Sequence, residues 1–92
     1  MRNAKIEAIK ENAEIVRIIN EILPLKKQGQ QYIALCPFHD EKNPSFKVSP
    51  RKQFFYCFGC GESGDVFDFV MKTNGVGFRR AVWMVDVYMR GY

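Results

Sequence analysis

The sequence is poor in cysteine and histidine, with three cysteines and a single histidine in 92 residues. An odd number of cysteines argues against the paired disulfide framework of a small secreted protein. Apolar stretches are short as well, and none approaches the roughly 20 residues that a membrane-spanning helix needs. The N-terminus mixes charged and apolar residues at helical spacing, unlike a signal peptide. These absences predict a soluble, cytoplasmic protein with no membrane partner.

Positive charge is in mild excess, because 14 lysines and arginines stand against 10 aspartates and glutamates and give a net charge of +4. This excess is only a weak indication of a polyanionic partner, since many basic domains bind no nucleic acid. The length predicts one small domain over residues 1–92. A domain of this length has a small hydrophobic core, so a bound metal ion would help it to fold.

All three cysteines and the histidine fall into two pairs, Cys36-x-x-His39 and Cys57-x-x-Cys60. Two such pairs, separated by residues 40–56, have the spacing of a closed tetrahedral zinc site with two ligands from each of two tight turns. Four protein ligands leave no open position for a catalytic water, so the spacing predicts one structural Zn²⁺. A redox Cys-x-x-Cys would not need the first pair, and an iron–sulfur cluster usually takes four thiolates.

Hydrophobic spacing divides the domain into three parts. Residues 1–23 are predicted to form a helical arm of two short helices, the second capped by Asn12. Residues 25–60 have the alternation and the Gly and Pro boundaries of short strands. Residues 65–90 are predicted to form two helices, the first of them capped by Asp65.

The predicted strands carry aromatic residues on both faces. In residues 53–58, alternation puts Phe55 and Cys57 on one side of the strand. The aromatic residues on the opposite side are Phe54, Tyr56 and Phe58. One of the two faces is therefore not plain core.

The last predicted helix, from Phe78 to Arg90, has one apolar face. The residues assigned to that face are Phe78, Ala81, Val82, Val85 and Met89. Trp83 and Val87 fall on the polar side instead. Either they pack under the N-terminal helices, or they form a docking patch for a partner protein, since large apolar side chains are unusual on a wet face.

Residues 36–65, CPFHDEKNPSFKVSPRKQFFYCFGCGESGD, resemble the Cys-His-Cys-Cys zinc-binding domain at the N-terminus of bacterial and phage DNA primases. The resemblance includes both ligand pairs, the Pro-Ser-Phe strand and the Cys-Phe-Gly-Cys-Gly turn. It extends upstream to LKKQGQQY and downstream to DVFDFVMK. It implies an α+β, zinc ribbon-like fold: a small antiparallel β-sheet with the metal at one end and helices flanking it at both termini.

The resemblance also implies a role in DNA replication. In that family the domain binds the single-stranded DNA template, helps to choose the start site and works with a separate RNA polymerase domain, in cis or in trans. A replicative helicase is a further expected partner through the same complex. The family's metal ligands correspond to Cys36, His39, Cys57 and Cys60. The sequence ends without a polymerase core or an acidic cluster for catalytic magnesium, so we expect the chain to be non-catalytic by itself.

Basic and aromatic residues of the strand region are the candidates for contact with DNA. Single strands are held by cations that follow the phosphates and by rings that stack on the bases. The residues predicted to contact the template are Lys47, Lys52 and Tyr56. Those predicted to add electrostatic attraction are Lys26, Lys27 and Arg51.

Two other functions remain open at this point. One is a zinc-stabilised adaptor that docks a protein through Trp83 and Val87 and binds no nucleic acid. The other is a small zinc-ribbon regulator of transcription that binds duplex DNA. Comparing single-stranded with duplex affinity separates the regulator from the primase module.

Overall fold

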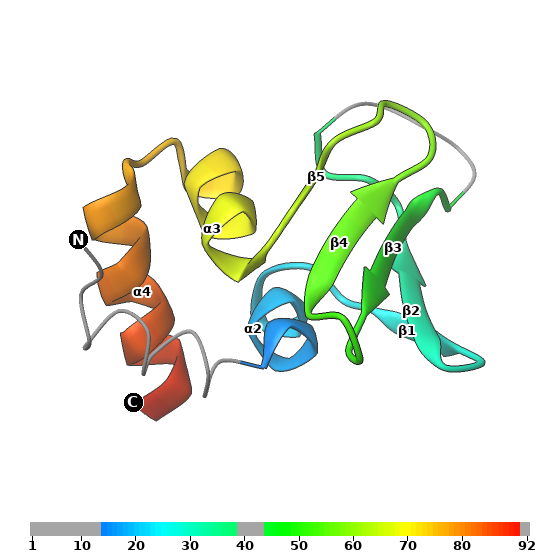
Figure 1. Cartoon of the computed structure of the whole chain (residues 1–92), viewed down its shortest axis with the longest axis horizontal. Coiled ribbons are helices and arrows are strands. Elements are labelled where there is room, and N and C mark those ends of the chain that lie inside the picture. Colours follow the sequence, from blue (N-terminus) through cyan, green and yellow to red (C-terminus); the bar gives the residue numbers. More distant parts are fainter. Residues whose placement is uncertain (1–13, 39–43, 91–92) are drawn as a thin grey trace.

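The structure, a computed structural model, describes residues 14–38 and 44–90. It confirms the α+β prediction, with helices packed against an antiparallel sheet (Figure 1). In chain order the elements are α2 (Ile15–Ile22), β1 (Lys26–Gln28), β2 (Gln31–Ala34), β3 (Phe46–Ser49), β4 (Phe54–Cys57), β5 (Ser63–Gly64), α3 (Val66–Asn74) and α4 (Phe78–Arg90). The first predicted helix and the predicted cap Asn12 lie outside the described residues. None of the described helices is long and apolar enough to cross a lipid bilayer.

The five strands form an antiparallel sheet in chain order, so each strand pairs with its neighbours in sequence. Between β3 and β4 the register sets Lys47 opposite Tyr56. The turn from β1 to β2 contains Gly29, whose φ of 64° lies in the left-handed region that glycine enters without steric strain. The strand β5 follows Cys60 and therefore lies beyond the predicted strand region of residues 25–60. Two residues are too few for alternation to reveal a strand.

The inner face of the sheet carries a cluster of aromatic rings at the centre of the core. Phe46 on β3 and Phe55 on β4 are fully buried, and their ring centroids lie 5.3 Å apart. Phe69 of α3 packs on both rings at 5.8 Å. Other fully buried side chains from the helices are Ile15, Ile18, Ile19, Val70 and Val85. Burying one large apolar side chain stabilises a fold by about 1.5–3 kcal/mol, so this cluster dominates a core of this size.

The helix α3 begins at the predicted cap, Asp65. The Asp65 carboxylate accepts the backbone N–H of Asp68 at 2.9 Å, and the Asp68 carboxylate accepts the backbone N–H of Asp65 at 2.9 Å. This reciprocal capping box satisfies two N–H groups at the start of the helix. The helix ends at Gly75, whose φ of 64° turns the chain toward α4.

The helix α4 has the predicted bounds and packs on α3, and its residues Ala81 and Val85 are fully buried. Phe78, which was assigned to the same face, is 44% exposed. Its ring meets Phe67 of α3 edge-on, with centroids 5.5 Å apart. Phe78 is the first residue of the helix, so α3 covers only one side of its ring.

The N-terminus of α2 is capped from the sheet and not by its own N-cap residue. Glu14 occupies the N-cap position without a side-chain hydrogen bond to the helix. The backbone N–H of Ile15 instead donates to Oε1 of Gln53 at 3.0 Å. Gln53 lies in the β3–β4 turn, has a left-handed φ of 56° and donates its amide N–H to the Pro50 carbonyl. One turn residue thus joins the hairpin to the helix.

Two substitutions of Gln53 should separate the contribution of its hydrogen bonds to stability from the cost of its left-handed backbone. Gln53→Ala loses both hydrogen bonds, so we expect the free energy of unfolding to fall by about 1–2 kcal/mol. Gln53→Gly loses the same bonds but relaxes the left-handed backbone, so its loss should be smaller by about 1 kcal/mol. Chemical denaturation of the metal-loaded proteins, followed by circular dichroism, measures both values. Wild-type stability of the alanine variant would contradict the capping role, and equal stability of the two variants would contradict the strain.

Candidate metal centre and nucleic-acid interface

Three of the four predicted metal ligands meet at one end of the sheet. Cys57 ends β4, Cys60 lies in the turn that follows it, and Cys36 follows β2. Their Sγ atoms all lie within 4.8 Å of one another, and those of Cys36 and Cys60 are 3.8 Å apart. Tetrahedral zinc with Zn–S bonds of about 2.3 Å needs sulfur atoms about 3.8 Å apart. The spacing of the thiols therefore fits a zinc site.

The first ligand turn is anchored in the core. The fourth predicted ligand, His39, lies outside the described residues, but the preceding Phe38 is described. Its backbone N–H donates to Sγ of Cys36 at 3.4 Å. Its ring lies 6.2 Å from that of Phe46 and 5.8 Å from that of Phe55, centroid to centroid. Phe38 thus packs beneath the site and ties the Cys36 turn to the aromatic core.

The second ligand turn is closed by a backbone hydrogen bond from the N–H of Gly61 to the carbonyl of Cys57, 2.8 Å long. Gly61 has a φ of 80°, which explains why a glycine stands here. Gly59, the other glycine of this turn, is not among the described glycines with positive φ. The need for glycine in this turn therefore rests on Gly61.

The buried thiols differ in their tendency to ionise. Burial raises the pKa of Cys36 to about 12. Burial also acts to raise the pKa of Cys57. Hydrogen bonds to its sulfur oppose this effect, first of all the one from the Ser45 hydroxyl at 3.5 Å, and the pKa of Cys57 is lowered to about 7. Three thiolates this close repel one another, and a shared cation allows all three to ionise. The chemistry of the donor set therefore fits zinc, which would hold the ends of β2 and β4 together.

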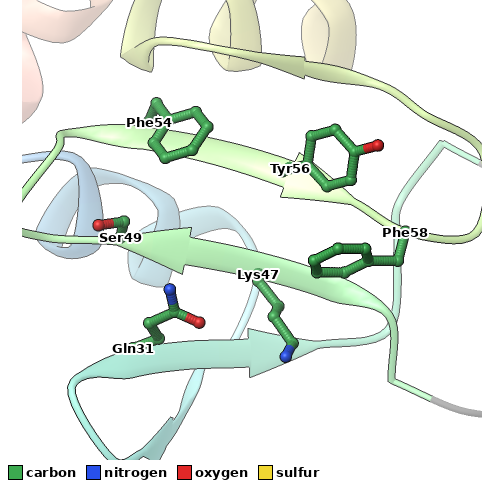
Figure 2. Close-up of a pocket in the computed structure, with 6 residues that line it drawn as sticks. All are labelled: Gln31, Lys47, Ser49, Phe54, Tyr56 and Phe58. Carbon is green, nitrogen blue, oxygen red and sulfur yellow. The ribbon is translucent and has the colours of Figure 1, made fainter.

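The outer face of the sheet, opposite the core, carries a groove of about 240 Å³ (Figure 2). Directly paired residues of neighbouring strands share a face. Pairing sets Lys26 opposite Ile33, Ile33 opposite Lys47, and Lys47 opposite Tyr56, so these four form one row across the sheet. The residues that line the groove are Gln31, Lys47, Ser49, Phe54, Tyr56 and Phe58.

The aromatic side chains of this groove are exposed, and two of them, Tyr56 and Phe58, contact each other. Phe54, Tyr56 and Phe58 are 36%, 37% and 66% exposed. Tyr56 and Phe58 meet edge to face with ring centroids 4.8 Å apart, and Nζ of Lys47 lies 5.1 Å from the centroid of Phe58. Exposed rings beside a cation are the combination that single-stranded nucleic acid sites use.

The six residues predicted to bind DNA do not lie on one surface. Lys26, Lys47 and Tyr56 share the row across the outer face. Lys27 pairs with Tyr32 instead, so alternation turns it to the other face of the sheet.

Arg51 and Lys52 are exposed in the β3–β4 turn, at the end of that hairpin away from the thiols. The backbone N–H of Lys52 donates to Oγ of Ser49 at 3.2 Å, which ties the turn to the groove.

The groove also contains residues that sequence reasoning did not assign to a site. Phe54 and Phe58 were expected to share a side with Tyr56, and that alternation was the available signal. Gln31 and Ser49 gave no signal, because their proximity depends on the register between β2 and β3. Strand register involves residues distant in sequence, and a single sequence does not reveal it.

The predicted protein-docking residues lie on α4, away from the sheet in Figure 1. Trp83 is 56% exposed and Val87 is half-buried. A groove of about 230 Å³ is lined by Trp83, Met84, Val87 and Tyr88. The guanidinium of Arg80 lies 5.0 Å from the Trp83 ring. Of the two N-terminal helices predicted to cover this pair, the first lies outside the described residues. The second, α2, is described, and Trp83 is still largely exposed.

Zinc binding should depend steeply on pH. The Cys36 thiol, with its pKa of about 12, is protonated at neutral pH, so zinc must displace its proton. As the pH falls from 8 to 6 through the pKa of Cys57, a second proton competes with the metal. We expect the apparent zinc affinity to fall by about tenfold or more per pH unit, measured by competition with a chromophoric chelator. An affinity that does not change over this range would contradict ligation by these thiolates.

Comparison with known proteins agrees with this site. A family model described as the CHC2 zinc finger matches residues 1–89. The chain is 54% identical over 76 residues to the DNA primase of Geobacillus stearothermophilus, covering 83% of this chain and 13% of that protein. It is 55% identical over 73 residues to the DNA primase of Synechocystis, covering 79% of this chain and 12% of that protein. The chain therefore spans only a small part of the length of the primases that it matches.

A solved structure gives the same result for the fold. The Aquifex aeolicus primase, in a structure of its zinc-binding and RNA polymerase domains, matches with a TM-score of 0.87 and 39% identity. The match covers 91% of this chain and 21% of that one. The clustered thiols, the matching fold and the family model agree, and the chain belongs to the CHC2 zinc finger family of DNA primases.

Proposed function

We propose that this chain is the template-binding module of a DNA primase, which binds single-stranded DNA on the outer face of its sheet. In this role it contributes to start-site recognition and primer synthesis in the cytoplasm, together with an RNA polymerase domain. The observation that carries the proposal is the groove lined by Lys47 and three exposed aromatic rings. The membership of the primase family supplies the biological context.

The groove offers the two interactions that hold a single strand. The Lys47 ammonium can pair with a phosphate, and the exposed rings of Phe54, Tyr56 and Phe58 can stack on bases. Stacking on an aromatic side chain is worth about 1–3 kcal/mol per base. A base within a duplex has both faces covered by its neighbours, so these rings favour single strands over duplex DNA. This argues against the alternative of a duplex-binding regulator.

The positive charges around the groove extend this surface. Lys26 stands in the same row as Lys47, and the exposed Arg51 and Lys52 lie beyond Ser49 in the β3–β4 turn. Lys26 can therefore contact a phosphate beside the groove, and Arg51 and Lys52 can attract the phosphate backbone without touching the bases. Lys27 lies on the other face and should add only long-range attraction.

Primer synthesis itself we assign to another domain. Among the described residues, the carboxylates of Asp65 and Asp68 cap α3, and that of Glu62 pairs with Lys72. These carboxylates serve local structure and do not converge on a magnesium site. The thiols fit a closed structural zinc. Both points support a binding role without catalysis for this chain.

A second function, docking onto the RNA polymerase domain, is favoured by the exposed groove on α4. Trp83 and Val87 lie at helical spacing on the side of α4 away from the buried Ala81 and Val85. Exposed apolar patches beside cations, here Arg80, commonly mark protein contacts. This surface is distinct from the sheet face, so DNA and a second domain could be bound at the same time.

Lysine substitutions on the sheet test the DNA-binding face. Lys26→Ala and Lys47→Ala should each weaken binding of a labelled single-stranded oligonucleotide and lower the salt-dependence slope by about 0.7. Lys27→Ala is the matched control, because it removes the same charge from the same strand on the opposite face. Fluorescence anisotropy over a salt series gives the affinities, and zinc content verifies each fold. If Lys27→Ala lost as much oligonucleotide affinity as Lys26→Ala, the result would argue against binding on the outer face.

A chimera tests the docking surface. This chain would replace the matching part of the Geobacillus stearothermophilus primase, with which it shares 54% identity. Val87→Asp in the chimera should reduce primer synthesis several-fold, because a carboxylate in an apolar contact is left unpaired. Template affinity of the isolated chain should not change. Arg90→Ala, on the same helix, serves as the control, and full primer synthesis by the Val87→Asp chimera would reject the docking role.

A further inference from the structure

The outer-face groove has polar side chains as well as rings, and these suggest selectivity. The inference rests on the proposed binding of single-stranded DNA. It concerns which base the groove accepts. We propose that the groove is a base-reading pocket in which Gln31 is the specificity-determining residue and favours adenine over thymine.

Register brings Gln31 into the groove. The pairing of Tyr32 with Val48 sets the preceding residue of β2, Gln31, beside Ser49 of β3. Ser49 in turn pairs with Phe54 of β4. Gln31, Ser49 and Phe54 thus form a second row on the outer face, next to the row that contains Lys47 and Tyr56. In Figure 2 the Gln31 amide extends from β2 toward Ser49.

The Gln31 amide can receive a ligand. Within residues 14–38 and 44–90, no hydrogen bond or ion pair engages its side chain. Ser49 differs, because it is only 9% exposed and its Oγ already accepts the backbone N–H of Lys52 at 3.2 Å. The Ser49 hydroxyl is therefore held in place and keeps one O–H that can donate.

A base in this pocket would meet three kinds of contact at once. Its ring can stack on Tyr56 or Phe54, which are each more than a third exposed. Its phosphate can reach the Lys47 ammonium at the rim beside Phe58. Its edge then faces the Gln31 carboxamide. Stacking and phosphate contacts accept any base, so the edge contact alone supplies selectivity.

The carboxamide sets the preference. It presents an N–H donor and a carbonyl acceptor side by side, which pair with N7 and the N6 amino group of adenine. Thymine offers the O4 acceptor and a methyl group on the corresponding edge, so it meets only the donor. A bidentate contact of this kind is worth at least about fivefold in discrimination.

The test compares affinities of the zinc-loaded protein for short homopolymers of deoxyadenosine and deoxythymidine by fluorescence anisotropy. Gln31→Ala should lower the ratio of the two affinities by about fivefold relative to wild type, because only the edge contact is lost. Intrinsic differences between the two homopolymers cancel in this comparison. Gln30→Ala is the matched control, because Gln30 is an exposed glutamine of the β1–β2 turn outside the groove lining.

A second variant should change which base the groove prefers, whereas Gln31→Ala only removes the preference. Gln31→Glu turns the side chain into an acceptor only, which suits the N4 amino group of cytosine. Its affinity for a deoxycytidine homopolymer, relative to deoxythymidine, should therefore rise several-fold. An unchanged ratio in Gln31→Ala, or an equal fall in Gln30→Ala, would overturn the pocket while leaving template binding intact. A wild-type protein that binds none of the oligonucleotides would overturn the proposed function itself.

Discussion

The close approach of three sulfur atoms at one end of the sheet is the constraint on which this structure depends. Cys36 and Cys57 are buried. Cys36 follows β2 and Cys57 ends β4, and these two strands do not pair with each other because β3 lies between them. Bringing thiolates to this distance is unfavourable without a cation, because like charges repel in a poorly solvated site. Zinc reverses the sign of that interaction, and structural zinc binding is worth about 10–16 kcal/mol in small domains. In a chain with a thin core, this term is comparable to the whole net stability of a folded domain.

The sheet separates two tasks by its two faces. The inner face stacks Phe46 and Phe55 under Phe69 of α3 and supplies the apolar burial. The rings of the outer face stay partly exposed to water, so they contribute less burial than those of the inner face. Because alternation assigns each residue to one face, Tyr56 and Phe55 are neighbours in sequence with opposite roles: Phe55 is fully buried, whereas Tyr56 is 37% exposed. Rings that stay partly exposed outside the core are the physical reason to look for a ligand on that face.

Local patterns in the sequence predicted the parts of this fold that depend on local physics. The paired ligand spacing predicted the thiol cluster, and Asp65 predicted the start of α3, because both involve residues a few positions apart. The failures concern contacts between distant residues. The cap of α2 comes from Gln53, which lies 38 positions away from Ile15 in the chain. Lys26 and Lys27 could not be distinguished either, since the face of each depends on the register of an edge strand.

The metal centre and the groove share one short segment, which links stability to binding. Phe58 stands inside the Cys57–Cys60 turn, so the backbone that carries its ring is held by the same ligands that would hold zinc. Its N–H also donates to the Ser45 carbonyl at 2.9 Å, and Ser45 contacts the sulfur of Cys57. The Phe58 ring in turn contacts two groove residues. Its centroid lies 4.8 Å from that of the Tyr56 ring and 5.1 Å from Nζ of Lys47. A ring fixed in this way loses less conformational entropy when a base stacks against it. A zinc ion held by these ligands would therefore act on the proposed nucleic-acid surface through the rigidity of one turn, without contacting DNA.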